Sequence, residues 1–263
     1  MRRIIAATSL LLAASVALSG CASAATAEKA RPSWSYGADT GPAQWQTLDP
    51  ACSTTRASRQ SPVDIDTSTL AIDPTAAPVV LHDRPASFEL GNDGHMIVAV
   101  ADDPHAYAIT IAGTRYDLRE LDFHAGSEHE LDGRPAAAEL QLVHVSSTGA
   151  IAVMSVLFRT GAANAALDEV FSSMPHPVTV GTDRVDLTEP IDPAALIPPG
   201  STSARYIGSL TSPPCTADVL WNVYLHPLTV SPAQLHDLTD IYSDNHRPVQ
   251  PLNGRTITGI AAG

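Results

Sequence analysis

Two short segments, Glu120–His124 and Glu139–His144, carry acidic, imidazole and amide side chains that alternate with apolar ones. Residues two apart on a strand share a face, so Asp122 and His124 point to the same side of the first segment. An Asp-Gly turn between the segments favours antiparallel pairing, which would bring both side chains near Gln141 at the floor of a cleft. Imidazole and carboxylate groups are metal ligands. The alternative is two half-buried strands with an acidic outer face.

The elements that position these side chains are predicted to be mostly strands. Short apolar stretches are interrupted by Pro and Gly, and many alternate or are rich in β-branched residues. Only two stretches, Asn164–Ser172 and Pro232–Ile241, read as helices, the second with Ser231 as its N-cap. The predicted strands are Pro62–Ile65, Ser87–Leu90, His95–Val100, Tyr107–Ile111, Arg115–Phe123, Ala137–Val145, Ala150–Phe158 and Trp221–Leu225, with Val178–Val180 as a shorter candidate.

Composition limits the class of protein. The chain has 263 residues, of which 44% are hydrophobic and 16% charged, so it contains enough apolar residues for a folded core and is not disordered throughout. Its formal net charge is −13, and Lys29 is its one lysine. Nucleic-acid binding requires clustered basic residues, so we expect no nucleic-acid partner.

The first residues predict export. Arg2 and Arg3 precede an apolar run that ends in Leu-Ser-Gly-Cys at Cys21, which resembles the lipobox of bacterial lipoproteins. We expect residues 1–20 to be a signal peptide, residues 21–31 a tether, and residues 32–263 one domain. A lipid on Cys21 would make the membrane a partner and give an extracytoplasmic location, whereas the alternative is plain secretion after cleavage near residues 22–25. Signal removal takes away two Arg, so the mature charge becomes 13 − 28 = −15.

Ordered motifs along the chain resemble the alpha-class carbonic anhydrase family over nearly the whole predicted mature length. The resemblance implies a mainly β (α+β) fold: a central, twisted, mostly antiparallel sheet with a conical cleft and few short helices. The motifs are Trp34-Ser35-Tyr36-Gly37, Gly41-Pro42-x-x-Trp45, Arg59-Gln60-Ser61-Pro62-Val63-Asp64-Ile65, Gly126-Ser127-Glu128-His129, Ala138-Glu139-Leu140-Gln141-Leu142-Val143-His144, Gly208-Ser209-Leu210-Thr211-Ser212-Pro213-Pro214-Cys215 and Asn245-His246-Arg247-Pro248-Val249-Gln250-Pro251-Leu252.

The metal site departs from the family pattern. Carbonic anhydrases hold zinc with three histidines, which is the best-known example of this kind of site. The resemblance places Asp122, His124 and Gln141 at the three ligand positions, so one imidazole remains. His129 and His144 are not expected to replace the others, since His144 points to the opposite face and the histidine at the position of His129 is not a ligand in the family. We expect a weakly bound divalent metal or none, and zinc if the protein is active.

Other positions match the working enzyme, and the resemblance implies their roles. His95 matches the proton shuttle, Tyr36 the residue that holds the shuttle waters, and Thr211 with Glu128 the pair that orients the zinc-bound hydroxide. Glu120 and Glu139 match residues that orient the metal ligands, although the family usually has Gln at the position of Glu120. The walls of the carbon dioxide pocket would be Val143, Val153, Leu210, Ser212 and Trp221, residues that ordinary packing would equally bury.

Three cysteines leave two after lipidation of Cys21. Exported bacterial relatives carry a disulfide at the places of Cys52 and Cys215, so the resemblance implies a bridge here, with two free buried thiols as the alternative. A loop of about 160 residues predicts a stabilisation of about 4–5 kcal/mol.

Three functions follow as hypotheses. The first is a carbonic anhydrase-like lipoprotein without efficient carbon dioxide hydration, which binds a ligand or acts as a scaffold. The second is an active carbonate dehydratase with an unusual metal site, and the third is another hydrolytic or metal-dependent activity in the same cleft. On one strand face Glu120 and Asp122 would lie about 7 Å apart. Such a pair of acids favours a cation or a guanidinium-like group between them.

Overall fold

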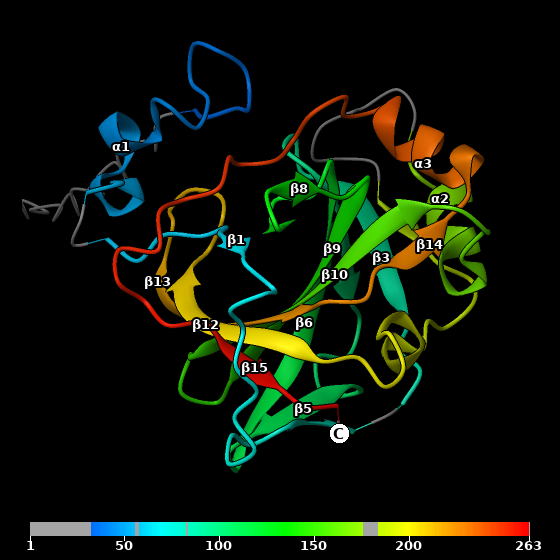
Figure 1. The fold of residues 1–263 in the computed structure, drawn as a ribbon. Coiled ribbons are helices and arrows are strands. Elements are labelled where there is room, and N and C mark those ends of the chain that lie inside the picture. The colour runs from blue at the N-terminus through cyan, green and yellow to red at the C-terminus, as the bar shows by residue number, and fades with distance from the viewer. Residues whose placement is uncertain (1–32, 56–57, 83, 176–183, 263) are drawn as a thin grey trace, which may run out of the picture. The chain divides into compact units, whose positions relative to one another are not determined.

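The computed structural model describes residues 33–55, 58–82, 84–175 and 184–262. Within these residues, twelve strands form one mixed, twisted sheet and three short strands form a second (Figure 1). The predicted fold class is therefore confirmed. The strands are β1 Asp64–Ile65, β2 Val79–His82, β3 Phe88–Asn92, β4 Ile97–Ala101, β5 Ala108–Ile111, β6 Thr114–Ala125, β7 Glu130–Leu131, β8 Arg134–Pro135, β9 Ala138–Ser146, β10 Ile151–Thr160, β11 Val185–Asp186, β12 Ser203–Ser209, β13 Ala217–Tyr224, β14 Leu228–Val230 and β15 Thr258–Ile260.

The main path of the large sheet runs β11-β3-β4-β6-β9-β10-β13-β12-β15. Most of its pairs are antiparallel, but β10 pairs in parallel with β13 and with β14. The long strands β6, β9 and β10 are neighbours in the middle of the sheet and are labelled in Figure 1. These three strands carry the two segments that the sequence singles out.

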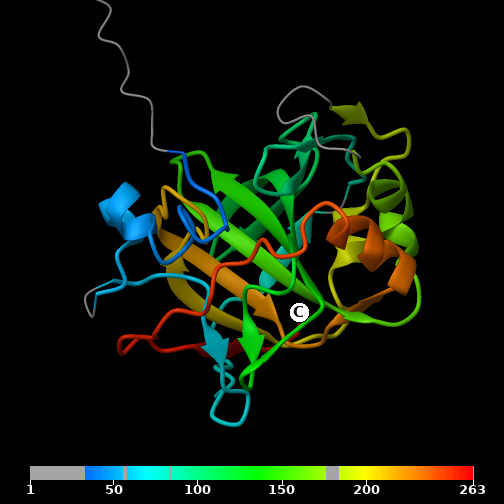
Figure 2. The ribbon, with the colours of Figure 1, turned by 90° about the horizontal axis from the view of Figure 1, so that it is seen from above.

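Helices are few and short, as expected. They are α1 Trp45–Leu48, α2 Asp168–Ser172 and α3 Pro232–Thr239, with short 3₁₀ turns at Pro50–Cys52, Ala165–Leu167 and Pro193–Leu196. The predicted cap at Ser231 is present, because its hydroxyl accepts from the backbone N–H of Gln234 while the Gln234 side chain accepts from the Ser231 N–H. Helices α2 and α3 pack together and lie side by side in both views (Figure 2). The predicted strand Val178–Val180 lies outside the described residues.

The sheet separates two apolar clusters because side chains alternate along each strand. One face of β6, β9 and β10 carries Leu121, Leu142 and Met154 in the larger cluster. The other face carries Val143 and Val153, which pack with Trp221 of β13 in a smaller cluster. The chemistry-bearing residues lie on this second face.

A bulge shifts the pairing of β6 with β9 between Leu118 and Glu120. A bulge inserts an extra residue that is left unpaired and re-aims the neighbouring side chains. Here the extra residue is Arg119, and both Arg119 and Glu120 line a cavity on the second face. Among the described helices, none is both long and apolar enough to cross a membrane.

Candidate active-site cleft

The floor of the cleft is built by the antiparallel pairing of β6 with β9. Asp122 lies directly opposite Gln141, and His124 lies opposite Glu139. Directly opposite residues point to the same side of a sheet, so the pairing brings together the side chains that the sequence placed at the cleft floor. They border a cavity of about 310 Å³ that is lined by Asp93, Met96, Val98, Arg119, Glu120, Asp122, His124, Gln141, Val143, Val145, Ile151, Leu210, Thr211 and Ser212.

Gln141 is held by two buried carboxylates. Its amide nitrogen donates to Glu128 Oε2 at 2.7 Å and to Glu139 Oε1 at 3.1 Å. An ionised carboxylate only accepts, so the amide must turn its NH₂ group toward the two acids and leave its carbonyl oxygen Oε1 for the cavity. The orientation of the Gln141 amide is therefore fixed by its neighbours.

Glu139 is the centre of a buried network. Its carboxylate accepts from the backbone N–H groups of Glu128 and His129, from the ring of His129 and from the hydroxyl of Ser155. Burial alone raises the pKa of this carboxyl, but the charge of His129 and the hydrogen bonds from it outweigh burial and lower the pKa to about 2. Glu139 is therefore ionised at neutral pH. It accepts the hydrogen bond from the Gln141 amide and so holds that side chain in place.

His129 and His144 both lie apart from the cleft floor, as expected. His129 bonds Glu139 through Nδ1 and the hydroxyl of Tyr206 through Nε2, so both ring nitrogens are used. His144 lies opposite Ala152 and Leu118, residues of the larger core cluster.

His124 keeps the environment of a ligating imidazole. Its Nδ1 donates to the backbone carbonyl of Asn245 at 2.9 Å, which leaves Nε2 as the second ring nitrogen, 3.6 Å from Glu128 Oε2. The Asn245 side chain also accepts from the backbone N–H of Ala125, so the segment at Asn245 fixes the end of β6. The sequence motif contains Asn245, but its support of His124 follows only from the fold.

Asp122 and Glu120 have no hydrogen-bond or ion-pair partner among the described residues, and Asp122 Oδ1 is buried. Burial, followed by the charges of Glu120, Asp93 and Glu128, raises the pKa of Asp122 well above its usual range. Burial and then Asp93 raise the pKa of Glu120. The cleft floor thus holds acids whose ionised forms are not stabilised by any neighbouring group that the structure describes.

Thr211 and Glu128 are both buried near the floor, but no hydrogen bond joins them in the described part of the chain. Glu128 instead accepts from the backbone N–H of Arg247 through Oε1 and from Gln141 through Oε2. Thr211 lines the cavity, and its hydroxyl has no partner among the described residues.

His95 and Tyr36 lie in an aromatic group that also contains Trp34 and Trp45. The ring of His95 stacks on Trp34 with 3.6 Å between centroids, and its Nε2 bonds the Trp34 carbonyl at 3.0 Å. His95 does not line the 310 Å³ cavity, although its neighbours Asp93 and Met96 do. The hydroxyl of Tyr36 is buried without a hydrogen-bond partner, and burial followed by the charge of Glu128 raises its pKa.

The predicted pocket wall divides into two layers. Val143, Leu210 and Ser212 line the cavity directly. Val153 and Trp221 are fully buried behind it, where the indole N–H of Trp221 donates to a backbone carbonyl. These two residues therefore support the wall rather than form its surface.

The predicted disulfide between Cys52 and Cys215 is present. It packs against Trp45 in a small cluster. The guanidinium of Arg247 donates to the Cys52 carbonyl and lies over the Trp45 ring at 5.5 Å. The bridge thereby connects the early loop to the segment that follows Thr211. Cys21 lies outside the described residues, so its lipidation stays a prediction.

The family resemblance implies a zinc ion at the positions of Asp122, His124 and Gln141. The three positions offer one carboxylate, one imidazole and one amide oxygen, and a neutral amide oxygen is a poor zinc ligand. Within the described ranges, no group of three or more His, Cys, Asp or Glu side chains is placed to hold a metal ion. The donor set of Asp122, His124 and Gln141 does not fit the tetrahedral three-histidine site.

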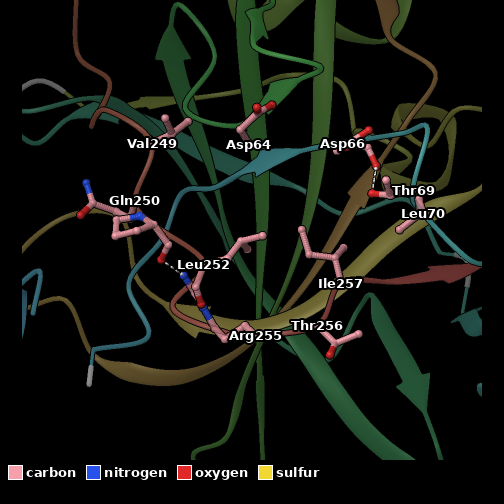
Figure 3. A pocket seen from close by; sticks show the side chains of 11 residues that line it. Asp64, Asp66, Thr69, Leu70, Val249, Gln250, Leu252, Arg255, Thr256 and Ile257 are labelled. Atoms are coloured by element: carbon pink, nitrogen blue, oxygen red, sulfur yellow. Dashed lines mark hydrogen bonds between the residues drawn. The ribbon is translucent and has the colours of Figure 1, made fainter. Parts of the chain in front are cut away.

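A second cavity of about 670 Å³ lies elsewhere on the molecule and is also bordered by acids (Figure 3). Its charged groups already have partners within the chain. Asp64 accepts from a backbone N–H and Asp66 from the hydroxyl of Ser68, while Arg255 donates to three backbone carbonyls. The acids of this cavity thus have hydrogen-bond partners within the chain, whereas Asp122 and Glu120 have none among the described residues.

Comparison with known proteins gives one family. The family model described as eukaryotic-type carbonic anhydrase matches residues 40–260. A carbonic anhydrase of Klebsiella pneumoniae is 37% identical over 226 residues, which are 85% of this chain and 89% of that protein. The alpha-carbonic anhydrase of Thermovibrio ammonificans, solved with the inhibitor sulfanilamide, has a TM-score of 0.79 at 34% identity and covers 86% of this chain and 98% of its own. Dioscorin, solved in complex with ascorbate, has a TM-score of 0.77 at 30% identity, over 88% of this chain and 99% of its own.

Proposed function

Since the chain belongs to the eukaryotic-type carbonic anhydrase family, we propose that it is a member whose cleft binds a ligand and does not hydrate carbon dioxide efficiently. The observation that carries this proposal is the state of Gln141, whose NH₂ group is committed to Glu128 and Glu139. The zinc-hydroxide mechanism requires an occupied Lewis-acid site, and Gln141 contributes at most a weak oxygen donor to it.

The state of Glu128 supports the same proposal. The family resemblance implies that this carboxylate accepts a hydrogen bond from the Thr211 hydroxyl. Here its two oxygens accept instead from the Gln141 amide and from the backbone N–H of Arg247. Replacing ligand-orienting groups alone costs about 10–100-fold in metal affinity or activity, and changing two ligands should cost more. Dioscorin, solved in complex with ascorbate, is a precedent for small-molecule binding by this fold.

The deciding experiment is stopped-flow carbon dioxide hydration with added zinc. We expect the natural protein to stay at the uncatalysed rate and to hold little zinc after dialysis. The double variant Asp122→His/Gln141→His should gain zinc and at least about 100-fold in rate. The two single variants serve as matched controls and should gain much less.

Two outcomes would overturn the proposal. A sulfanilamide-sensitive rate in the natural protein would make it an active carbonate dehydratase with an unusual metal site. Hydrolysis of 4-nitrophenyl acetate that is abolished by Thr211→Val would assign a different hydrolytic activity to the same cleft.

We further propose that the protein is exported and anchored to a membrane through Cys21, on the strength of the lipobox-like sequence. The full-length protein should enter the membrane fraction, and its N-terminal peptide should carry the mass of a lipid. Cys21→Ser should release it to the soluble fraction, and release of the natural protein without lipid would favour plain secretion.

A further inference from the structure

The cleft floor offers hydrogen-bond acceptors that nothing in the described chain satisfies. Asp122 Oδ1 is buried without a partner, and the Glu120 carboxylate has none. Gln141 is only 3% exposed, and its carbonyl oxygen is left facing the cavity once its NH₂ group is bound. Thr211 is 4% exposed and lines the same cavity with a hydroxyl that has no described partner. A buried polar group is normally satisfied, so Asp122 Oδ1 indicates a partner from outside the described chain, and the other three groups offer that partner further hydrogen-bonding positions at the cavity.

The missing partner should be positively charged. Asp93, Glu120 and Asp122 all border the cavity, and Arg119 is the one Arg or Lys side chain among its lining residues. Arg119 forms no ion pair with a described carboxylate. Asp93 accepts from the backbone N–H groups of His95 and Met96, and its Oδ1 lies 3.8 Å from Nδ1 of the His95 ring. Three carboxyl groups and one Arg make the cavity acidic, and a cation between the carboxyl groups would stabilise their ionised forms and reduce the repulsion between them.

The geometry favours an organic cation over a metal ion. A metal ion needs several donors around one point, and the described residues offer no such group of three or more. The acceptors are instead spread along β6 and β9, from Glu120 through Asp122 to Gln141. A guanidinium or amidinium group matches this arrangement, because it is planar, permanently charged and donates several hydrogen bonds in a fixed fork.

A smaller cavity, distinct from that of Figure 3, adjoins the 310 Å³ cavity of the cleft and leaves room for the rest of the ligand. It has about 280 Å³, is also bordered by Gly91 and Arg184, and shares Asp93, Val98 and Glu120 with the cleft. Arg184 is paired with Glu89 at 3.1 Å, so this outer cavity has no unpaired basic group to demand an anion. A charged head would lie against Asp122 and Glu120, and an uncharged tail would extend past Val98.

We propose that the cleft binds a small organic cation of the guanidinium or amidinium class, with its head between Asp122 and Glu120 and with Gln141 Oε1 as a further acceptor. This inference rests on the proposed function and names the ligand class of that same cleft.

The test uses methylguanidinium with its neutral isostere methylurea as the control ligand, and n-butylguanidinium as a probe with a longer uncharged tail. Binding to the full chain is measured by NMR chemical-shift titration and by calorimetry. Methylguanidinium should shift resonances of β6 and β9 and bind at least about tenfold more tightly than methylurea, and n-butylguanidinium should bind more tightly still.

Matched variants locate the site. Asp122→Asn and Glu120→Gln keep the shape of the side chain and should each weaken methylguanidinium about tenfold or more. Asp66→Asn removes the same charge from the cavity of Figure 3 and should leave binding unchanged. Far-ultraviolet circular dichroism and melting curves check that each variant is folded. If one of the two cleft variants is unfolded, the affinity of the other variant and the chemical-shift changes in the natural protein still test the site.

The two proposals fail in different ways. Equal binding of methylguanidinium and methylurea, or binding that only Asp66→Asn weakens, overturns the organic-cation site and leaves the catalytically silent cleft standing. Zinc-dependent hydration of carbon dioxide overturns the proposed function whatever the cation does. Displacement of methylguanidinium by one equivalent of zinc, with shifts centred on His124, would replace the organic cation by a metal ion and overturn the ligand class.

Discussion

Lowering the pH should destabilise this fold through His144, a side chain on the face of β9 that lies away from the proposed ligand site. The ring is fully buried on β9 and lies 5.9 Å from that of Tyr107. Its Nδ1 donates to the Leu142 carbonyl at 2.8 Å, and its Nε2 is buried without a hydrogen-bond partner. A carbonyl only accepts, so Nδ1 carries the proton of the neutral ring, and a second proton would have to enter at the buried Nε2.

Burial lowers the pKa of His144 from 6.5 to about 4. Between pH 6.5 and pH 4, His144 is therefore protonated in the unfolded chain but neutral in the folded chain. The stabilisation is complete above the unfolded pKa and is lost as the pH falls from 6.5 toward 4. Each pKa unit is worth about 1.4 kcal/mol, so the full effect is about 3 kcal/mol, of which about 2 kcal/mol is lost between pH 7 and pH 5.

The assay is urea unfolding of the natural protein and of His144→Leu at a series of pH values. Comparing the two proteins cancels the titration of the other groups. Glu139 loses its contribution only at lower pH, because its pKa is lowered to about 2, and its response should be shared by both proteins. The free energy of unfolding should fall about 2 kcal/mol less in His144→Leu than in the natural protein between pH 7 and pH 5. Parallel curves, or an NMR titration of His144 near 6.5 in the folded state, would refute the reasoning.

Two further substitutions test the support of the cleft. The bridge between Cys52 and Cys215 spans 163 residues, so the double Ser variant should lose about 5 kcal/mol of unfolding free energy in urea, and an unchanged midpoint would contradict the chain-entropy account. A Cβ on Gly208 would overlap the Ser61 hydroxyl and approach two aromatic rings, so Gly208→Ala should lower stability by about 1–3 kcal/mol in thermal unfolding, whereas Gly37→Ala, whose Cβ meets only an ordinary contact, should change it little.

The strands predicted from alternation are present where one face is apolar and the other is mixed. The segment Arg115–Phe123 corresponds to β6 and Ala150–Phe158 to β10, each within a few residues. Strand β12 was missed because Ser, Arg, Tyr and Gly fill much of it, and these residues are buried through hydrogen bonds as well as apolar contact. The predicted helix from Asn164 is a 3₁₀ turn followed by α2, since the Asn164 side chain caps the turn first.

Part of the site was predictable and part was not. The placement of Asp122 opposite Gln141 follows from alternation and an antiparallel turn, and the structure has that register. The bonds of Gln141 to Glu128 were not predictable, because they depend on a loop that folds back over β9. The bulge at Arg119 was equally hidden, since no Gly or Pro marks it in the sequence. The stacking of His95 on Trp34 joins residues 61 positions apart and required the tertiary fold.

From the parallel pairing of β10 with β13 we expect one part of the large sheet to form later than the rest. Strands β3, β4, β6, β9 and β10 are close in sequence and pair antiparallel, so they can form by successive hairpins, each within about 1–10 μs. Strand β13 must return from far along the chain, and the loop-closure entropy is lost before its contacts form. Until it docks, β10 presents an apolar edge with free backbone groups, which is a template for pairing with another chain. We therefore expect aggregation of the newly made protein to depend on how soon β13 docks as well as on the final stability.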